Sequence, residues 1–567
     1  MSRINVRYIP LLLIALGCFF FFPFLGRVHL FDWDEINFAE SAREMIVSGN
    51  YARVQINFQP FWQKPPLFFW LQALAMHGFG INEYAARFPN AVIGVLTLVV
   101  LFLIGRRLHD ARFGLLWALG YLGSITPHFY FKTAIIDPTF NFFIFVGVWF
   151  LYKAHLIGSP DRPSPPPSQG EGSRKVSGVS SLSFARRRVG GEVWAGLFLG
   201  LAVLTKGPVG ALLPGLMLGI IWALNRFRPL LSGRALGVII LVGLLVTTAW
   251  FGLEVAQNGP WFLVEFIKYQ IVLFSTPDAG HAQPFYYHFI VVLLGAFPLS
   301  VLAIRYATRI RSNNSDAPFL SWMVALFWVV MIVFSIVKTK IVHYSSLAWF
   351  PVSYMAAYHL YQVLTGRVQW HRWTTIGLLV VGGLLGIVLT AAPLVGMNKD
   401  VLIPYIKDPF AVANLQANVS WGGWEWLIGG LWLVALVVCV MRLRRQTFSA
   451  AVGLFLSTAT MLFFFASTVV PNIEQIVQGT VINFYQSKQG QDVYVEPIGY
   501  KSYAQFFYFQ KKPPVNPRTT DENYLLNGPV DKPTFLIARI NNADDFRKNP
   551  NLMVVKEENG FVFFKRK

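Results

Sequence analysis

Residues 84–112 read YAARFPNAVIGVLTLVVLFLIGRRLHDAR, an apolar run followed at once by an arginine-rich connection. A helix needs about 20 consecutive apolar residues to cross the hydrocarbon core of a bilayer. The run at 84–105 meets that length. Because arginine and lysine gather in the cytoplasmic connections of membrane proteins, GRRLHDAR at 105–112 also orients the helix. This stretch predicts a spanning helix that ends at the cytoplasmic face.

The composition of the whole chain agrees with that prediction. Hydrophobic residues make up 54% of the 567 residues and charged residues 13%, whereas soluble chains carry about 25% charged residues. The formal net charge is +20. Such a charge can indicate nucleic acid binding, but here the basic residues fall mainly in short connections between apolar runs. We therefore expect membrane lipids, and no nucleic acid, as partners.

The apolar runs predict an α-helical polytopic membrane protein with about thirteen spanning helices. The candidate spans are centred on 8–26, 84–105, 113–131, 135–156, 193–206, 207–225, 235–255, 286–304, 319–337, 342–364, 373–395, 424–441 and 448–470. With a cytoplasmic N-terminus, every inner connection is arginine-rich: 105–112, 158–192, 225–234, 304–311, 366–372 and 441–445. The first run shows no small-residue cleavage site, so we expect a retained anchor. These patterns predict a multi-pass membrane protein with a cytoplasmic N-terminus, located in the inner (plasma) membrane if the source is a bacterium.

The same counting divides the chain into two domains. Residues 1–470 form the predicted transmembrane domain, with an outer amphipathic-helix loop at 27–83 and a flexible cytoplasmic insertion at 158–192 that is rich in Pro, Ser, Gly and Arg. Residues 471–567 then lie outside, in the periplasm of a Gram-negative source. They contain the strand-like segments QDVYVEPI, TFLIARI, NLMVVK and GFVFFKR and the helix-like segment YKSYAQFFYFQ. We expect a small extracytoplasmic α/β domain.

The first outer loop contains the acidic stretch LFDWDEINFAESAREMIVSGN at 30–50. Asp32 and Glu35 have capping-box spacing, and Gly49 is a typical C-terminal cap, so a helix is predicted to start near Asp32 or Asp34 and to end at Gly49. A second helix is predicted in KPPLFFWLQALAMHGFG at 64–80. Its apolar part is too short to span a bilayer and should lie in the interface or on the bundle.

The five acids of this stretch have different expected roles. Asp34 is the candidate general base, although capping the helix is the alternative for its carboxylate. We expect Asp32 and Glu35 to act as caps and Glu40 and Glu44 to be solvated.

Several lysines fall on the same outer side, where basic residues are not expected from orientation alone. Lys64 and Lys206 each adjoin proline or Gly-Pro at a helix boundary, and Lys338 and Lys340 lie in VKTKIVHYSS. Lysines that converge from separate loops would bind a phosphate and stabilise its charge as it leaves, while a carboxylate accepts a proton from an incoming hydroxyl. For each lysine alone, snorkelling to outer headgroups is the alternative.

No phosphate-binding loop or dinucleotide fingerprint occurs in the chain. DWD at 32–34 matches the D-x-D pattern of soluble glycosyltransferases, but an outward site has little access to nucleotide sugars. A lipid-linked donor fits this location better.

These motifs carry a family resemblance. The segments are DWDEINFAESAREMIVSGNY, FWQKPPLFFWLQALAMHGFGINEYAARFPNAVIG, LTKGPVGALLPG, HAQPFYYHFIVVLLGAFPLS and KTKIVHYSSLAWFPVSYMAA. In this order, over roughly residues 8 to 470, they resemble the bacterial polyprenyl-phosphate-dependent glycosyltransferases, which include lipid A aminoarabinose transferases and, more distantly, protein O-mannosyltransferases. The resemblance implies a GT-C fold. It also implies inverting transfer of a monosaccharide from a polyprenyl-phosphate carrier to a lipid A, protein or glycan acceptor at the outer face.

The resemblance also implies roles for single residues. Asp34 matches the catalytic acidic residue, and Asp137 matches a second acid at the head of the fourth span; a cap before Pro138 is the alternative for Asp137. Lys64 matches the lysine that contacts the carrier phosphate, and Tyr344 resembles a residue near that site. Glu35, Lys206, Lys338 and Lys340 complete the predicted set for substrate and carrier phosphate.

Two positions depart from the aminoarabinose transferases. Gln63 stands where they have Glu before Lys-Pro, and Asn37-Phe38 stands where they have Arg-Tyr. Glutamine is a poorer metal ligand than glutamate, so a divalent ion held by this position and His281 is left as an open possibility. An outer-loop hydrogen bond is the alternative for His281. The departures also leave the sugar undetermined.

Two other functions compete with sugar transfer. A transporter or lipid flippase is compatible with many spans and buried charges, but transporters tend to show internal repeats and binding near the midplane. An inactive carrier-binding scaffold would tolerate the loss of Asp34 and Lys64. We expect a monomeric enzyme.

Overall fold

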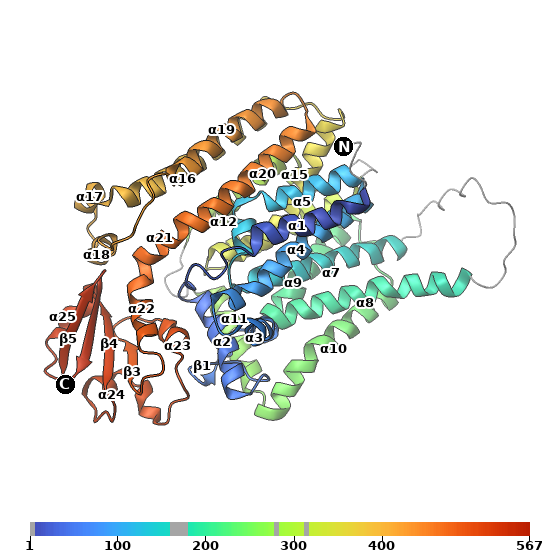
Figure 1. Cartoon of the computed structure of the whole chain (residues 1–567). Coiled ribbons are helices and arrows are strands. Elements are labelled where there is room, and N and C mark those ends of the chain that lie inside the picture. The colour runs from blue at the N-terminus through green and yellow to red at the C-terminus, as the bar shows by residue number, and fades with distance from the viewer. Residues whose placement is uncertain (1–5, 159–179, 277–282, 311–316) are drawn as a thin grey trace, which may run out of the picture.

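The computed structural model of the chain describes residues 6–158, 180–276, 283–310 and 317–567. A bundle of long helices makes up most of it, and a small mixed sheet lies at one end (Figure 1). The helices of the bundle and its outer loops, in chain order, are α1 (Ile9–Phe21), α2 (Asp34–Ser48), α3 (Leu67–Phe79), α4 (Glu83–Leu108), α5 (Ala111–Leu122), α6 (Ile125–Tyr130), α7 (Asp137–Gly158), α8 (Ser180–Lys206), α9 (Val209–Leu224), α10 (Gly233–Asn258), α11 (Trp261–Ser275), α12 (Tyr287–Gly295), α13 (Leu299–Ala307), α14 (Pro318–Ile336), α15 (Trp349–Leu364), α16 (Arg372–Met397), α17 (Lys399–Leu402), α18 (Pro409–Leu415), α19 (Trp426–Leu443) and α20 (Phe448–Phe464).

Each of the thirteen apolar segments forms helix, although two segments are divided. The segment 113–131 forms α5 and α6, and the segment 286–304 forms α12 and α13. Pro298 precedes α13 directly, and a proline lacks the N–H that would continue the preceding helix. In the described part of the chain, seven helices are long and apolar enough to cross a membrane. They are α4, α7, α10, α14, α16, α19 and the continuous helix Phe448–Ser487. The protein is therefore a multi-span helical membrane protein, and thirteen crossings stay a prediction.

The predicted insertion at 158–192 lies only partly in the described structure. Residues 159–179 lie outside the described residues, while residues 180–192 form the start of α8.

Close packing of α4 against α5 shows how small residues position the bundle. A Cβ added at Gly105 would lie 2.7 Å from the Cα of Gly114, and one added at Gly114 would lie 2.5 Å from the carbonyl oxygen of Phe102. Only glycine allows these two backbones to approach so closely, as small residues do at many helix interfaces in membranes.

Both helices predicted for the loop at 27–83 are present. Helix α2 ends at Gly49, which has the left-handed φ of 70° that favours glycine, and α3 follows after a two-stranded hairpin of β1 (Gln55–Ile56) and β2 (Gln59–Pro60).

The prediction that Glu40 and Glu44 are solvated is wrong. Both are fully buried. Arg43 donates to both carboxylate oxygens of Glu40 at 2.7 Å and to the carbonyl oxygen of Lys511 at 2.8 Å, so the C-terminal domain closes over this face of α2. Glu44 accepts the backbone N–H of Phe58, and burial together with the charge of Glu40 raises its pKa to about 9.

The predicted capping by Asp32 is also wrong. Trp33 occupies the N-cap position of α2, and no side chain caps it. Asp32 instead accepts the N–H groups of Trp33 and Tyr503, which ties the start of α2 to the C-terminal domain.

The C-terminal part begins as a continuation of α20. Two π-helical turns, η4 (Phe465–Val469) and η5 (Gln475–Gly479), alternate with α21 (Val470–Glu474) and α22 (Thr480–Ser487). The helix therefore continues beyond residue 470, where the sequence analysis places the domain boundary. A sheet follows that contains β3 (Tyr494–Pro497), β4 (Thr534–Arg539), β5 (Leu552–Glu558) and β6 (Phe561–Arg566). Its order is β3-β4-β6-β5, with β3 parallel to β4 and the other neighbours antiparallel.

The strand and helix predictions for this part are confirmed. The described elements after α22 are β3 (Tyr494–Pro497), α23 (Ala504–Tyr508), η6 (Pro517–Thr520), α24 (Glu522–Asn527), β4 (Thr534–Arg539), α25 (Ile540–Arg547), β5 (Leu552–Glu558) and β6 (Phe561–Arg566). In Figure 1 the sheet lies away from the turn that joins α19 to α20, which carries the arginines at 441–445. The arginine-rich turn and the C-terminal domain thus lie at opposite ends of this helix pair.

Candidate active site

A polar cavity of about 750 Å³ opens beside the start of α2. Its walls come from segments that are far apart in the chain: the start of α2, the segment before α3, the start of α7, the end of α8, α11, and the segment that leads into the 3₁₀ helix η2 (Val342–Ala348). The C-terminal domain adds Lys501 and Tyr503 to the lining. The first outer loop and the C-terminal domain thus enclose one polar space together.

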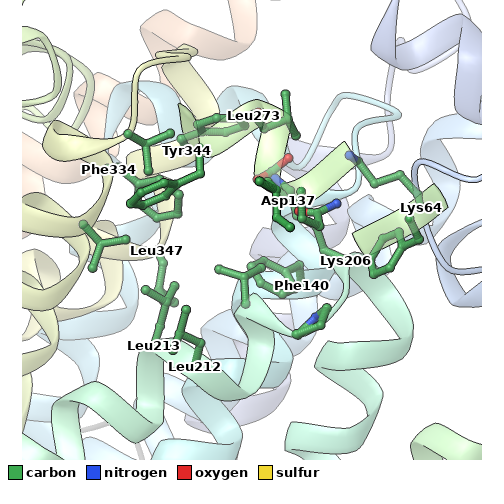
Figure 2. Close-up of a pocket in the computed structure, with 18 of the residues that line it drawn as sticks. Lys64, Asp137, Phe140, Lys206, Leu212, Leu213, Leu273, Phe334, Tyr344 and Leu347 are labelled. Carbon is green, nitrogen blue, oxygen red and sulfur yellow. The ribbon is translucent and has the colours of Figure 1, made fainter. Parts of the chain in front are cut away.

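An apolar cavity of about 400 Å³ adjoins it. Side chains of α9, α11 and α14 form most of its wall, among them Leu212, Leu213, Phe266 and Phe334 (Figure 2).

Lys64, Asp137, Lys206, Leu273 and Tyr344 line both cavities. Figure 2 shows Lys64, Asp137 and Lys206 gathered on one side of the apolar cavity. Phe334 and Leu347 lie across from them. A charged junction between an apolar and a polar space suits an amphiphile whose anionic centre separates a hydrocarbon chain from a polar group.

The junction contains one tight ion pair. Lys206, the last residue of α8, donates to Asp137, the first residue of α7, at 2.5 Å. The Asp137 side chain is only 4% exposed. The ammonium of Lys206 also lies 5.3 Å from the ring centre of Tyr344. Asp137 thus holds the ammonium of Lys206 at the junction, and its buried carboxylate is already paired.

Lys64 supplies the second ammonium of the junction. It lies in the segment between β2 and α3, outside the spanning helices, and its ammonium is 5.8 Å from the ring centre of Tyr269. Burial, and after it the charge of Lys206, lower the pKa of Lys64 to about 8, while Asp34 and Asp137 oppose this shift. An anion placed between Lys64 and Lys206 would relieve their repulsion.

The carboxylate of Asp34, unlike that of Asp137, is accessible. Asp34 is the first residue of α2, and its side chain is 43% exposed in the polar cavity. Its Oδ2 lies 3.5 Å from Nε2 of His343, which comes from η2. The preceding Trp33 has a φ of 77°, a strained conformation for a residue with a side chain. Such strain is concentrated at functional sites.

Glu35 lines the polar cavity, but protein groups occupy both of its oxygens. Arg87 bonds both, at 3.0 and 2.8 Å, and the N–H groups of Phe31 and Ala134 bond one each. Burial alone would raise the pKa of Glu35, yet Arg87 and these hydrogen bonds hold it below its usual value. This geometry favours anchoring of the loop over contact with a carrier phosphate.

Comparison with known proteins supports the same chemistry. The chain is 27% identical over 474 residues to the undecaprenyl phosphate-alpha-4-amino-4-deoxy-L-arabinose arabinosyl transferase 1 of Pseudomonas fluorescens. The aligned region covers 82% of this chain and 77% of the relative. The chain is 28% identical over 397 residues to the corresponding transferase of Edwardsiella ictaluri, which covers 66% of this chain and 64% of the relative. A family profile described as dolichyl-phosphate-mannose-protein mannosyltransferase matches residues 63–161.

A solved structure shares the fold over almost the whole chain. ArnT of Cupriavidus metallidurans bound to undecaprenyl phosphate superposes with a TM-score of 0.73 at 18% identity, covering 99% of this chain and 98% of that chain. The apo structure of the same protein also has a TM-score of 0.73. The chain is thus similar to polyprenyl-phosphate-dependent glycosyltransferases in sequence and in fold. The predicted resemblance is thereby confirmed, and the GT-C fold with it.

Two lysines predicted for the carrier phosphate, Lys338 and Lys340, lie outside the two cavities. Neither Lys338 nor Lys340 is among the residues that line the two cavities. Lys338 is exposed, and the buried ammonium of Lys340 donates to the carbonyl oxygen of Val337 at 2.8 Å. Lys206 and Lys64 are therefore the lysines that the fold brings together.

His281, named for the predicted metal site, lies outside the described residues. Across the residues that are described, no group of three or more His, Cys, Asp and Glu side chains could hold a metal ion. Gln63 lines the polar cavity of the glycosyltransferase beside Lys64.

Sequence reasoning assigned no role to several residues of the polar cavity. His343, Asn37, Lys501 and Tyr503 line it. The motif KTKIVHYSS contained the signal for His343, because it adjoins Tyr344 in a segment already singled out. Nothing in the local pattern of residues 500–510 indicated that Lys501 and Tyr503 reach the cavity, since that contact depends on how the domain packs.

Proposed function

We propose that this protein transfers a monosaccharide from a polyprenyl-phosphate carrier to an acceptor at the outer face of the bacterial inner membrane, with inversion at the anomeric carbon. The observation that carries the proposal is the pair of adjoining cavities that share Lys64, Lys206 and Asp137. A polyprenyl-phosphate sugar has the same three parts in the same order: a hydrocarbon chain, a phosphate and a sugar.

In this arrangement the isoprenoid chain lies in the apolar cavity and the phosphate lies at Lys64 and Lys206. The sugar lies in the polar cavity, where the buried Oδ1 of Asn37 has no hydrogen-bond partner among the described residues and can accept a bond from a hydroxyl or ammonium group. Two ammonium groups at the phosphate stabilise the charge that develops on it as it leaves.

Asp34 acts as the general base. Its exposed carboxylate takes the proton of the acceptor oxygen while that oxygen forms its bond to the anomeric carbon. The bond between the anomeric carbon and the phosphate oxygen breaks on the opposite face, and polyprenyl phosphate leaves with the electron pair. Asp137 assists by holding Lys206, and the ring of Tyr344 confines the ammonium of Lys206 from the side. This division of roles follows from the exposure of Asp34 and the burial of Asp137.

The names of the relatives favour 4-amino-4-deoxy-L-arabinose as the sugar, and the family resemblance favours lipid A as the acceptor. The departures at Asn37 and Gln63 both lie in the polar cavity, where the sugar would bind. Their position makes the choice of sugar the feature that these two residues would change relative to the relatives.

The proposal includes a topology. Thirteen crossings with a cytoplasmic N-terminus put residues 27–83, the two cavities and the domain after residue 470 on the outer side. The arginine-rich connections then face the cytoplasm, as orientation rules require.

Sugar transfer by the purified protein tests the proposal. The protein is reconstituted in lipid nanodiscs and incubated with undecaprenyl-phosphate sugars that carry a labelled aminoarabinose, arabinose or mannose. Lipid A, a glycan and a peptide serve as acceptors. We expect labelled product from at least one pair and none with the variant Asp34→Asn. Movement of the labelled lipid between leaflets without any product would replace the proposal with a flippase.

A further inference from the structure

A second polar hollow of about 730 Å³ lies where the C-terminal domain meets the outer end of the helices. Its walls are the segment 416–420 after α18, the π-helical turn η5, α22, and residues of β5, β6 and the turn between them. It shares no lining residue with either cavity of the active site. In Figure 1, α18 lies between α17 and the C-terminal sheet, and it contacts η5 and α25.

Carboxamide side chains dominate this hollow. The amide-bearing residues that line it are Gln416, Asn418, Asn472, Gln475, Asn483 and Asn559. Each amide offers two N–H donors and one carbonyl acceptor without a charge. The charged residues of the lining, Lys556 and Glu558, pair with each other at 2.7 Å. The hollow is therefore rich in hydrogen-bonding groups and close to neutral.

Part of this amide set is held in place by the protein. Asn559 donates to the Thr480 hydroxyl at 2.6 Å, and Asn472 donates to the carbonyl oxygen of Ser420 at 3.2 Å. These bonds join the sheet to α22 and the helix to the 416–420 segment. The hollow thus has a wall that is fixed before any ligand arrives.

Another part of the set is available. Asn418 and Asn483 are exposed, and within the described ranges their side chains make no hydrogen bond to the protein. Gln475, from the π-helical turn η5, also lines the hollow, and its amide donates to the Glu474 carboxylate at 3.3 Å. Single π-helical turns inside α-helices occur frequently at functional sites.

We propose that this amide hollow is a saccharide-binding site separate from the catalytic cavity, and that it holds uncharged sugar units of the acceptor. A sugar hydroxyl donates and accepts at once, which matches amide groups better than it matches a charged wall. The half-buried Phe484 adds an apolar ring to the lining, and its ring centre lies 4.5 Å from that of Phe563. The link to the acceptor rests on the proposed function, whereas saccharide binding itself does not.

Equilibrium binding to the full-length protein in nanodiscs tests the site. Maltotriose and N,N′,N″-triacetylchitotriose serve as soluble neutral probes, and saturation-transfer NMR reports their binding. Asn418→Ala combined with Asn483→Ala should weaken binding by about fivefold or more, as expected for the loss of two neutral hydrogen bonds. Gln486→Ala is the matched control, because Gln486 is an exposed amide on the same helix that does not line the hollow. It should bind both probes as the unaltered protein does.

Three results would overturn the site: no binding of either probe to the unaltered protein, equal binding by the double variant, or loss of binding in Asp34→Asn. The last of these would move the saccharide into the catalytic cavity. Tetraglycine, an uncharged-backbone peptide probe, should not compete with the saccharides, and competition by it would assign the hollow to peptides. Thermal melting confirms that the exposed substitutions leave the fold intact.

Turnover tests which acceptor supplies the sugar units that bind in the hollow. Two acceptors carry the same glycan, one free in solution and one attached to a lipid in vesicles. The double variant should raise KM for the acceptor that is the physiological one and leave kcat and the donor KM unchanged. An unchanged KM for both acceptors would overturn the assignment to the acceptor. Failure of the proposed function would show differently, as an absence of transfer by the unaltered protein while saccharide binding persists.

Discussion

At the residue scale, Asp34 and Asp137 differ in what surrounds each carboxylate. Asp137 is buried and hydrogen-bonded to Lys206, so its charge holds the ammonium of Lys206 in position. Asp34 is 43% exposed, and its nearest described ionic neighbour is His343 at 3.5 Å. A proton acceptor must be reachable from the substrate, and of these two acids Asp34 satisfies that condition.

Replacing each of the two acids should therefore give different kinetics. Asp34→Asn should lower kcat by about 10²- to 10⁴-fold, the usual contribution of a general base, with little change in the donor KM. Asp137→Asn should raise the donor KM, because Lys206 loses its partner. Initial rates over a range of donor concentrations separate these effects. Asp32→Asn keeps an acceptor oxygen for Tyr503 and serves as the control in the same loop; an equal loss of kcat in it would contradict the assignment of Asp34.

The lowered pKa of Lys64 leads to a prediction for pH dependence. The protonated lysine attracts the phosphate, and with a pKa of about 8 it loses that proton as the pH rises through 8. Because kcat/KM reports groups of the free enzyme, it should fall by about tenfold per pH unit above this value. Lys64→Arg keeps its charge at all these pH values and should move the decline upward. A decline at the same pH in Lys64→Arg would show that another group causes it.

Gln63 offers a test of sugar choice in the polar cavity. Gln63→Glu adds a negative charge to the lining, so a donor sugar with an ammonium group should gain relative to one with a hydroxyl. A hydrogen bond to a charged group supports a shift of about tenfold in the ratio of kcat/KM values. The paired donors are undecaprenyl-phosphate aminoarabinose and undecaprenyl-phosphate arabinose. An unchanged ratio would place Gln63 away from the sugar.

At the scale of elements, the outer loop shows which features local sequence can predict. The end of α2 at Gly49, the start of α3 after Pro66, and the four C-terminal strands follow from caps and alternation within a few residues. The burial of Glu40 and Glu44 does not, because it depends on Arg43 reaching Lys511 of a distant domain. A solvated face and a face covered by another domain have the same local pattern.

The buried acids of α2 give this element its own pH dependence. The pKa of Glu44 rises from 4.5 to about 9, so the folded state holds a proton that the unfolded state releases in this range. Stability should therefore fall as the pH increases from about 4.5 to 9. Glu44→Gln removes the titration and should melt at a higher temperature than the unaltered protein at pH 9, with little difference at pH 5. Glu40→Gln should destabilise at both pH values because it deprives buried Arg43 of its charge partner. If the melting temperature of Glu44→Gln changed with pH in the same way as that of the unaltered protein, this account would be contradicted.

At the scale of the whole molecule, the helical segments and the outer domain are predictable from composition, but the site is not complete without their packing. Each apolar run contains enough information for a helix, and the lysines could be placed on the outer side. The packing of α7, α8 and α11 decides which lysines meet. It brings Lys64 and Lys206 to one junction and leaves Lys338 and Lys340 outside it. The same packing brings Lys501 and Tyr503 into the catalytic cavity.

The C-terminal domain contacts the loop before α2, which leads to the candidate active site. The hydroxyl of Tyr508 accepts a hydrogen bond from the backbone N–H of Leu30 at 2.6 Å. The ring of Tyr503 packs edge-to-face against the ring of Trp33, with ring centres 5.6 Å apart. Tyr508 is buried, so Tyr508→Phe leaves a buried N–H unpaired, at a cost of about 1–3 kcal/mol. The start of α2 carries Asp34, so this loss should lower both the melting temperature and kcat.

A matched tyrosine separates this effect from a general weakening of the domain. Tyr494→Phe removes a bond to Asp531 that is exposed and belongs to the C-terminal domain alone. It should leave kcat unchanged. Melting curves and initial rates of both variants in nanodiscs make the comparison. If Tyr508→Phe lowers the melting temperature but not kcat at a temperature where it is fully folded, the domain stabilises the chain without positioning Asp34. If it lowers both while Tyr494→Phe lowers neither, the link from Tyr508 through Leu30 to α2 is part of what holds the base in place.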